Sequence, residues 1–199
     1  MEIRSFIAIK LPDELKRELG RLQARLKKEE PPGVKWVDPN GIHLTLKFLG
    51  DVEENWLSEI TDAIKTAVQG TPPFNLVVKE LGVFPNLKRV QVVWVGMSGE
   101  VDKLGQLQQR LESKLAPLGF APETRPFVPH LTLARLRDQT SMAERERFGQ
   151  VITKTKFESA YPIKVETISL MKSELTREGA IYSLISSVGL EKPLSTTTA

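Results

Sequence analysis

The chain contains two histidines, and both begin the same tetrapeptide, His-Leu-Thr-Leu. The first copy runs from His43 to Leu46 and the second from His130 to Leu133. Strand propensity does not explain this coincidence, because strands favour β-branched and aromatic residues and have no particular use for histidine. The repeated unit therefore indicates chemistry as well as structure.

Each copy presents a histidine and a threonine together. Side chains alternate between the two faces of a strand, so His43 shares a face with Thr45, and His130 shares one with Thr132. Imidazole titrates near neutral pH, so one neutral ring can accept a proton while a second, protonated ring donates one. Threonine hydroxyls can donate hydrogen bonds to phosphate oxygens. The pattern predicts proton transfer at both ends of a phosphate ester.

Other chemistries fit the pattern less well. The chain has no cysteine and no His-x-x-x-His spacing, and threonine is a poor zinc ligand, so we predict neither a metal nor another cofactor. A serine-type triad pairs one nucleophile with one base and would not duplicate a His-x-Thr unit. A rival of another class stays open, namely a module that binds a nucleotide or an RNA end without turnover.

Three residues that follow the motifs bear on the site. Arg135 and Phe48 occupy equivalent positions of the two copies, and strict alternation places them opposite the histidines. A β-bulge or the strand's end would redirect them, Arg135 toward a phosphate and Phe48 toward a base that it could stack on. Otherwise they are a surface ion pair and a core phenylalanine. Alternation puts Lys47 on the His43 face, either as an active-site cation or as a solvated lysine.

The elements that must position these residues follow from periodicity. Apolar stripes with helical spacing predict helices near residues 12–26, 57–68, 101–115 and 141–151. Period-two patterns predict strands at 4–10, 34–37, the two motifs, 74–81, 90–95, 161–171 and 180–188. Asp51 with Glu54, and Ser141 with Glu144, resemble helix capping signals. This order is not the strict alternation of a doubly wound sheet, so we predict an α+β fold.

Composition indicates an ordinary soluble protein. Of 199 residues, 40% are hydrophobic and 27% charged, and the net charge of +3 suits an anionic ligand. No run approaches the roughly 20 apolar residues of a membrane span, and the N-terminus lacks the apolar region of a signal peptide. We therefore expect a cytoplasmic monomer without membrane contact. Residues 1–190 are predicted to form one domain with two facing halves, and 191–199 a disordered tail.

The motifs with their surroundings, VKWVDPNGIHLTLKFLGDV and RPFVPHLTLARLR, resemble the 2H phosphoesterase superfamily. The resemblance is to its RNA 2′,3′-cyclic phosphodiesterase branch, historically called 2′-5′ RNA ligase. It extends from SFIAIKLP to SLMKSELTREGAIYSLI and so covers almost the whole chain. It implies a bilobal fold with two pseudo-symmetric lobes, each a small antiparallel sheet flanked by helices, and an active-site cleft between them.

The resemblance also implies an activity and residue roles. Members hydrolyse the terminal 2′,3′-cyclic phosphate of RNA to a 2′-phosphate without a metal, and some weakly catalyse reversible 2′-5′ joining. Carried over, His43 protonates the departing 3′ oxygen, His130 activates water, Thr45 and Thr132 bind the phosphate, and Arg135 helps to neutralise it. The sequence alone does not distinguish acid from base. It also leaves open whether the substrate is an RNA end, a small nucleotide or an ADP-ribose-type cyclic phosphate.

Three further residues carry no decisive local signal. Trp36, which precedes the first motif, suits the core as well as it suits a stacking platform. Ser173 and Tyr182 belong to the C-terminal stretch that resembles the family, but nothing in their neighbourhood indicates contact with a substrate.

Overall fold

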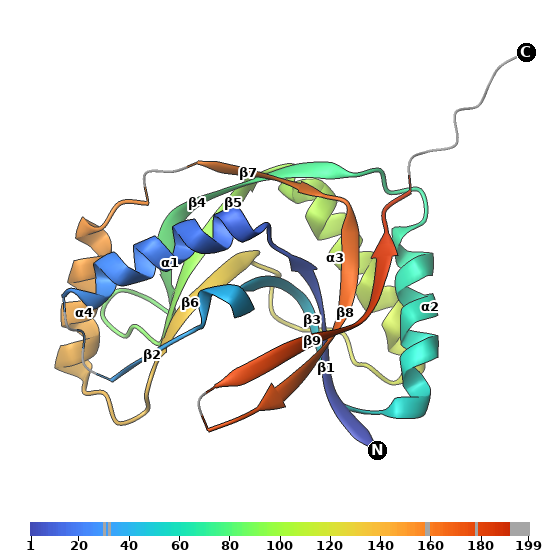
Figure 1. Cartoon of the computed structure of the whole chain (residues 1–199), viewed down its shortest axis with the longest axis horizontal. Helices are drawn as coiled ribbons and strands as arrows, with labels where there is room; N and C mark the ends of the chain where they lie inside the picture. The colour runs from blue at the N-terminus through green and yellow to red at the C-terminus, as the bar shows by residue number, and fades with distance from the viewer. Residues whose placement is uncertain (30, 32, 158–159, 178, 192–199) are drawn as a thin grey trace, which may run out of the picture.

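The computed structural model describes residues 1–29, 31, 33–157, 160–177 and 179–191, and the predicted tail beyond Glu191 lies outside them. The helices are α1 (Asp13–Lys27), α2 (Leu57–Val68), α3 (Val101–Leu115) and α4 (Met142–Lys154). The strands are β1 (Glu2–Lys10), β2 (Val34–Trp36), β3 (His43–Glu53), β4 (Phe74–Phe84), β5 (Val92–Gly99), β6 (His130–Leu136), β7 (Tyr161–Val165), β8 (Thr167–Leu175) and β9 (Ala180–Gly189). The predicted α+β class is confirmed (Figure 1).

The strands form one curled antiparallel sheet with two halves. Its order is β7-β4-β5-β6-β3-β1-β8-β9, and β2 pairs with β6. We call β3, β1, β8 and β9 the first lobe, and β6, β5, β4, β7 and β2 the second lobe. The central neighbours β3 and β6 are paired through one residue from each strand, Leu44 and Leu131. The predicted bilobal arrangement is confirmed, with the refinement that the two small sheets are continuous through this pair.

The chain crosses between the lobes more than once. β4 precedes the second motif yet pairs with β5 in the second lobe, and β8 follows that motif yet pairs with β1 in the first. The single strand expected at 161–171 is wrong for this reason. It is two strands, β7 in the second lobe and β8 in the first, and the chain passes between lobes at Glu166. The break does leave a mark in the periodicity, because the buried apolar positions change from Ile163 and Val165 to Ile168 and Leu170, from odd to even residues.

The helices cover the sheet face that carries the motif leucines. α2 and α3 pack together and contact β9 and β3 of the first lobe, whereas α4 contacts β4 of the second. α1 reaches the second lobe as well, since Gln23 donates a hydrogen bond to the carbonyl oxygen of Leu133 in β6, at 2.9 Å. The stripes predicted for α1 and α3 are buried, except for the half-buried Val101 at the start of α3, and they include Leu15, Leu19, Leu104 and Leu107. Burial of each such leucine stabilises the fold by roughly 1.5–3 kcal/mol.

The two predicted capping signals had different outcomes. The Ser141 hydroxyl accepts a hydrogen bond from the Glu144 backbone N–H, and the Ser141 backbone N–H donates one to the Glu144 carboxylate, so this capping box begins α4. The signal at Asp51 is wrong, because β3 continues to Glu53 and α2 begins at Leu57 without a side-chain cap. Within the described ranges, no helix has the length and apolar character needed to cross a membrane.

Candidate active site

The pairing of β3 with β6 places both histidines on one face of the sheet. Leu44 and Leu131 are paired and fully buried, so their neighbours in each strand point to the opposite face. Counting outward from this antiparallel pair, His43 stands opposite Thr132, and Thr45 stands opposite His130. The histidines are diagonal neighbours, whose Cα atoms in a regular pair lie roughly 7–8 Å apart. That spacing leaves room for one small anionic group between the two rings.

Each histidine is held by the same local hydrogen bond. Nδ1 of His43 lies 2.8 Å from the carbonyl oxygen of Gly41, and Nδ1 of His130 lies 2.7 Å from that of Val128. In both cases the partner is two residues upstream and can only accept, so Nδ1 must carry the proton. Nε2 is then the atom that reacts, as a lone pair in the neutral ring and as an N–H donor in the cation.

A β-bulge follows the histidine and threonine in both copies. Thr45 and Lys47 pair with consecutive residues of β1, which makes Leu46 an extra residue. In the second copy Leu133 is the extra residue, because Thr132 and Ala134 pair with consecutive residues of β5. Each bulge reverses the alternation after it.

The bulges decide where the next residues point. Phe48 is 69% exposed, and its ring lies 6.2 Å from the ring of Phe6, which itself stacks on His43. Arg135 is exposed, and its charge acts on two groups of the histidine face. It adds to the lowering of the pKa of His130 by burial, and it opposes the rise that burial causes in the pKa of Tyr182. Both residues therefore lie on the histidine face. Of the alternatives left open, the bulge applies, and the core position of Phe48 does not.

Lys47 is turned the other way. It is 8% exposed, on the side of the sheet opposite His43, so neither predicted position for it is correct. Strict alternation failed here because Leu46 is the extra residue. Trp36 is half-buried against the core and meets Phe148 edge-on, with ring centroids 6.4 Å apart, which matches its core alternative.

Each histidine contacts two aromatic rings, which also contact each other. Phe6 stacks on His43 at 4.6 Å and 28° between the planes, and Tyr182 meets the same ring edge-on at 4.9 Å. Phe84 meets His130 edge-on at 5.0 Å, and Trp94 lies tilted at 6.3 Å. The rings belong to β1, β9, β4 and β5.

Two glycines leave room for these rings. A side-chain carbon on Gly41 would lie 3.2 Å from the ring of Tyr182, and one on Gly82 would lie 2.3 Å from that of Trp94. Ser173 lies on β8 and pairs with Tyr182 of β9. Phe6, Phe84 and Trp94 carry no signal in the sequence, because only the long-range strand pairing places them beside the motifs.

Burial lowers the pKa of both His43 and His130 below the ordinary value of 6.5, because the imidazolium loses hydration. The backbone carbonyl bonded to each ring opposes this lowering by favouring the charged form. A cation adds to it, Lys16 at His43 and Arg135 at His130. Both rings are therefore mainly neutral in the free protein at pH 7. Lys16, in α1, is a further residue that sequence analysis missed.

The described residues contain no group of three or more His, Cys, Asp or Glu side chains placed to hold a metal ion. The functional groups that the two motifs bring to one face are two imidazoles, two threonine hydroxyls and one guanidinium. The prediction that the site works without a metal stays a prediction.

Comparisons with known proteins identify relatives over most of the chain. A family model described as LigT like Phosphoesterase matches twice in tandem, at residues 9–94 and 95–182. The chain is 34% identical over 183 residues to a protein of Methanothermobacter thermautotrophicus named RNA 2′,3′-cyclic phosphodiesterase, covering 92% of this chain and 96% of the relative. A Methanocaldococcus jannaschii protein of the same name is 33% identical, with 92% and 98% covered.

A solved structure shares the fold. The crystal structure of E. coli LigT complexed with 3′-AMP superimposes with a TM-score of 0.78 at 25% identity, covering 96% of this chain and all of that one. The tandem match also divides the chain between the two motifs, with one histidine in each half. On the family match and the identities together, the chain belongs to the LigT-like phosphoesterase family.

Proposed function

We propose that the protein is an RNA 2′,3′-cyclic phosphodiesterase that hydrolyses a terminal 2′,3′-cyclic phosphate to a 2′-phosphate. The observation that carries the proposal is the matched pair of Nδ1-anchored imidazoles, His43 and His130, on one face of the sheet. The names of the archaeal relatives support the substrate class.

His43 and His130 act at opposite ends of one displacement. Neutral His130 accepts a proton at Nε2 from a water molecule, whose oxygen forms a new bond to phosphorus. The bond from phosphorus to the 3′ oxygen breaks, and the Nε2 proton of cationic His43 passes to that oxygen. The products are a 2′-phosphate and a free 3′ hydroxyl, and the histidines exchange protonation states before the next cycle.

The threonines and Arg135 hold the phosphate. Thr45 and Thr132 stand beside the histidine of the opposite copy, so their hydroxyls can donate to the two non-bridging oxygens. The guanidinium of Arg135 lies near His130 and opposes the charge that develops on phosphorus-bound oxygens. A bound phosphate anion also favours the charged form of the adjacent acid, offsetting the lowered pKa of His43.

Phe48 supplies a surface for the base. Its ring is largely exposed on the histidine face, beside Phe6. An aromatic ring in this setting binds a nucleobase by stacking, with little preference among bases. The substrate is therefore an RNA end or a nucleotide with a cyclic phosphate, and no membrane or second copy of the chain is needed.

The same site can join RNA ends weakly. If the 5′ hydroxyl of another strand replaces water, His130 takes its proton and His43 again protonates the 3′ oxygen. The product is a 2′-5′ phosphodiester, and the reverse reaction uses the same two groups with their roles exchanged.

Product analysis tests the proposal directly. The protein is incubated with a 2′,3′-cyclic mononucleotide and with an RNA that ends in a cyclic phosphate, in the presence of a chelator. We expect a 2′-phosphate from both. Binding without any product would favour the alternative of a nucleotide- or RNA-end-binding module, and a 3′-phosphate would reverse the assigned leaving group. Activity lost with chelator and restored by zinc would contradict the metal-free mechanism.

A further inference from the structure

A buried lysine lies directly behind the first motif. The bulge at Leu46 turns Lys47 away from His43, and its side chain is 7% exposed. Among the residues described, the buried charged side chains are Lys47 and Arg145. An ammonium removed from water needs compensating acceptors, so its partners define what it does.

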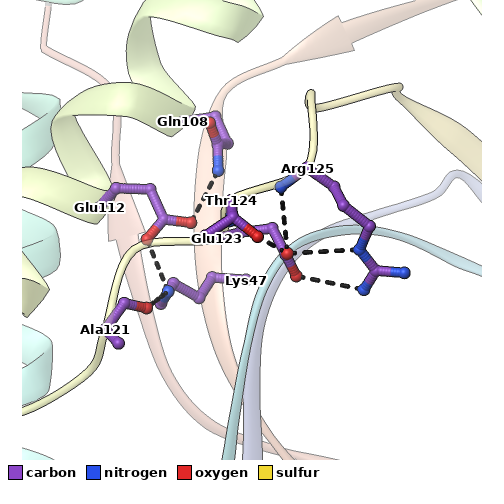
Figure 2. A network of polar contacts seen from close by, with 7 residues as sticks. All are labelled: Lys47, Gln108, Glu112, Ala121, Glu123, Thr124 and Arg125. Carbon is purple, nitrogen blue, oxygen red and sulfur yellow. Dashed lines mark hydrogen bonds and ion pairs between the residues drawn. The ribbon is translucent and has the colours of Figure 1, made fainter.

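Lys47 joins three parts of the chain (Figure 2). Its Nζ donates to Oε2 of Glu112 on α3 at 2.5 Å and to the carbonyl oxygen of Ala121 at 2.7 Å. Oε1 of Glu112 accepts from Nε2 of Gln108 at 2.9 Å. The carboxylate is thus fixed from both sides, and the ammonium is aimed at a backbone carbonyl beyond α3.

Ala121 lies near the start of an irregular segment, residues 119–129, that leads to the second histidine. Residues 119–129 contain no helix or strand, and residues 121–126 are exposed. Figure 2 shows the internal contacts of this segment, where Glu123 binds the backbone and guanidinium of Arg125. Within the described residues, the bond from Lys47 is the one hydrogen bond that ties 121–126 to another element.

The far end of this segment orients His130. The carbonyl oxygen of Val128 holds Nδ1 of His130 at 2.7 Å and so selects its tautomer. The ladder between the motif strands is short, with the single pair of Leu44 and Leu131. His130 is also paired with Gly96 of β5, and Phe127 packs partly buried against the core. Between Phe120 and Phe127, the bond from Lys47 to Ala121 is what fastens the segment that leads to Val128.

We propose that Lys47 is a positioning residue, which fastens segment 119–129 through Ala121 and so keeps His130 in its Nδ1–H tautomer. The strand of the first motif thereby helps to set the histidine of the second. The effect on catalysis rests on the proposed function, but the effect on the tautomer does not.

The obvious variant does not separate positioning from stability. Lys47→Met leaves the charged Glu112 buried without its partner, which destabilises the fold. The double variant Lys47→Met/Glu112→Gln removes both charges and keeps an acceptor for Gln108. It should recover most of the thermal stability that the single variant loses, while Ala121 still lacks its donor.

The decisive measurement is the tautomer of each histidine ring. Nitrogen-15 NMR resolves this directly, because the chain has two histidines. In the double variant we expect His130 to populate the Nε2–H tautomer while His43 stays Nδ1–H. We also expect kcat to fall roughly tenfold to a hundredfold, with KM changed less than about twofold, because a small misplacement of a reacting group slows the chemical step.

The control is Lys65→Met/Asp62→Asn, which removes an exposed ion pair with the same charges, on α2. It should leave the tautomers, kcat and KM as in the parent protein. If His130 stays Nδ1–H in the Lys47→Met/Glu112→Gln variant, the positioning role is wrong, whatever happens to kcat. If the parent protein turns over no cyclic phosphate, the proposed function fails, and the tautomers still decide the role of Lys47.

Discussion

The two motif copies share their backbone geometry and differ in what surrounds it. In both, a histidine is anchored to the carbonyl two residues upstream, and a bulge follows the threonine. The residue that the bulge returns to the histidine face is Phe48 in one copy and Arg135 in the other. The shared features are those that proton transfer requires at both ends. Under the proposed function, the difference assigns Phe48 to the nucleobase and Arg135 to the phosphate.

The supports behind the bulges differ as well. At the second bulge the carbonyl of Leu133 accepts from the backbone of Val37 and from Gln23, both at 2.9 Å. At the first bulge, the residue after the extra Leu46 is Lys47, and its side chain forms an ion pair with Glu112 of α3. In each case the helix comes from the opposite half of the sequence. The two bulges thus share a backbone geometry but are supported by different interactions, hydrogen bonds to a carbonyl in one copy and an ion pair in the other.

Removing either ring gives the largest expected effect and tests whether the two ends are equivalent. His43→Ala and His130→Ala should each lower kcat by roughly a hundredfold to ten-thousandfold, which is the usual contribution of a general acid or base. The double variant should lose little more than the worse single variant, because the groups act in one step. Circular dichroism should show unchanged folding. Near-parental turnover in either single variant would contradict the two-histidine mechanism.

The residues that distinguish the copies should have smaller and separable effects. Arg135→Met should lower kcat/KM by roughly a hundredfold, because charge stabilisation in the transition state is lost. Phe48→Ala should raise KM by roughly tenfold, the typical value of one stacked base. A ribose 2,3-cyclic phosphate without a base serves as control. On it Arg135→Met should still be slow and Phe48→Ala should match the parent, and equal effects of Phe48→Ala on both substrates would exclude stacking.

The smallest expected effect is the pH dependence of kcat/KM, which follows from the partly buried histidine that both copies contain. Burial lowers the pKa of both His43 and His130 from 6.5, so the form with one ring charged is most populated below that pH. We expect a bell-shaped kcat/KM profile with its maximum below pH 6.5. The kcat profile should lie at higher pH, because the bound phosphate raises the pKa of the acid. A kcat/KM maximum above pH 7 would mean that the rings are not buried in the free protein.

The sequence predicted the elements and the faces of each motif well, because both follow from local periodicity. The α+β class, the helical stripes, the strands predicted at 74–81 and 90–95 and the Ser141 capping box are confirmed. The bulges also left a signal that was not used. In the second copy the buried positions change from Leu131 and Leu133 to Ala134 and Leu136, a shift from odd to even residues.

The remainder depended on contacts between distant segments. Nothing near the motifs indicates that Phe6, Tyr182, Phe84 and Trp94 surround the histidines, because each comes from another strand. Lys47 was misplaced because one extra residue in a strand reverses every following side chain. The shift of the buried positions at Glu166, from Ile163 and Val165 to Ile168 and Leu170, is a local signal that was not used, but only the strand pairing shows that the chain changes lobes there.

The crossing of strands between the lobes determines how the molecule can be divided. β4 of the first sequence half completes the second lobe, and β8 of the second half completes the first. A chain cut between the two halves would leave each lobe without a strand unless both pieces were present. The two halves must therefore fold together, and the two histidines come into place in the same event.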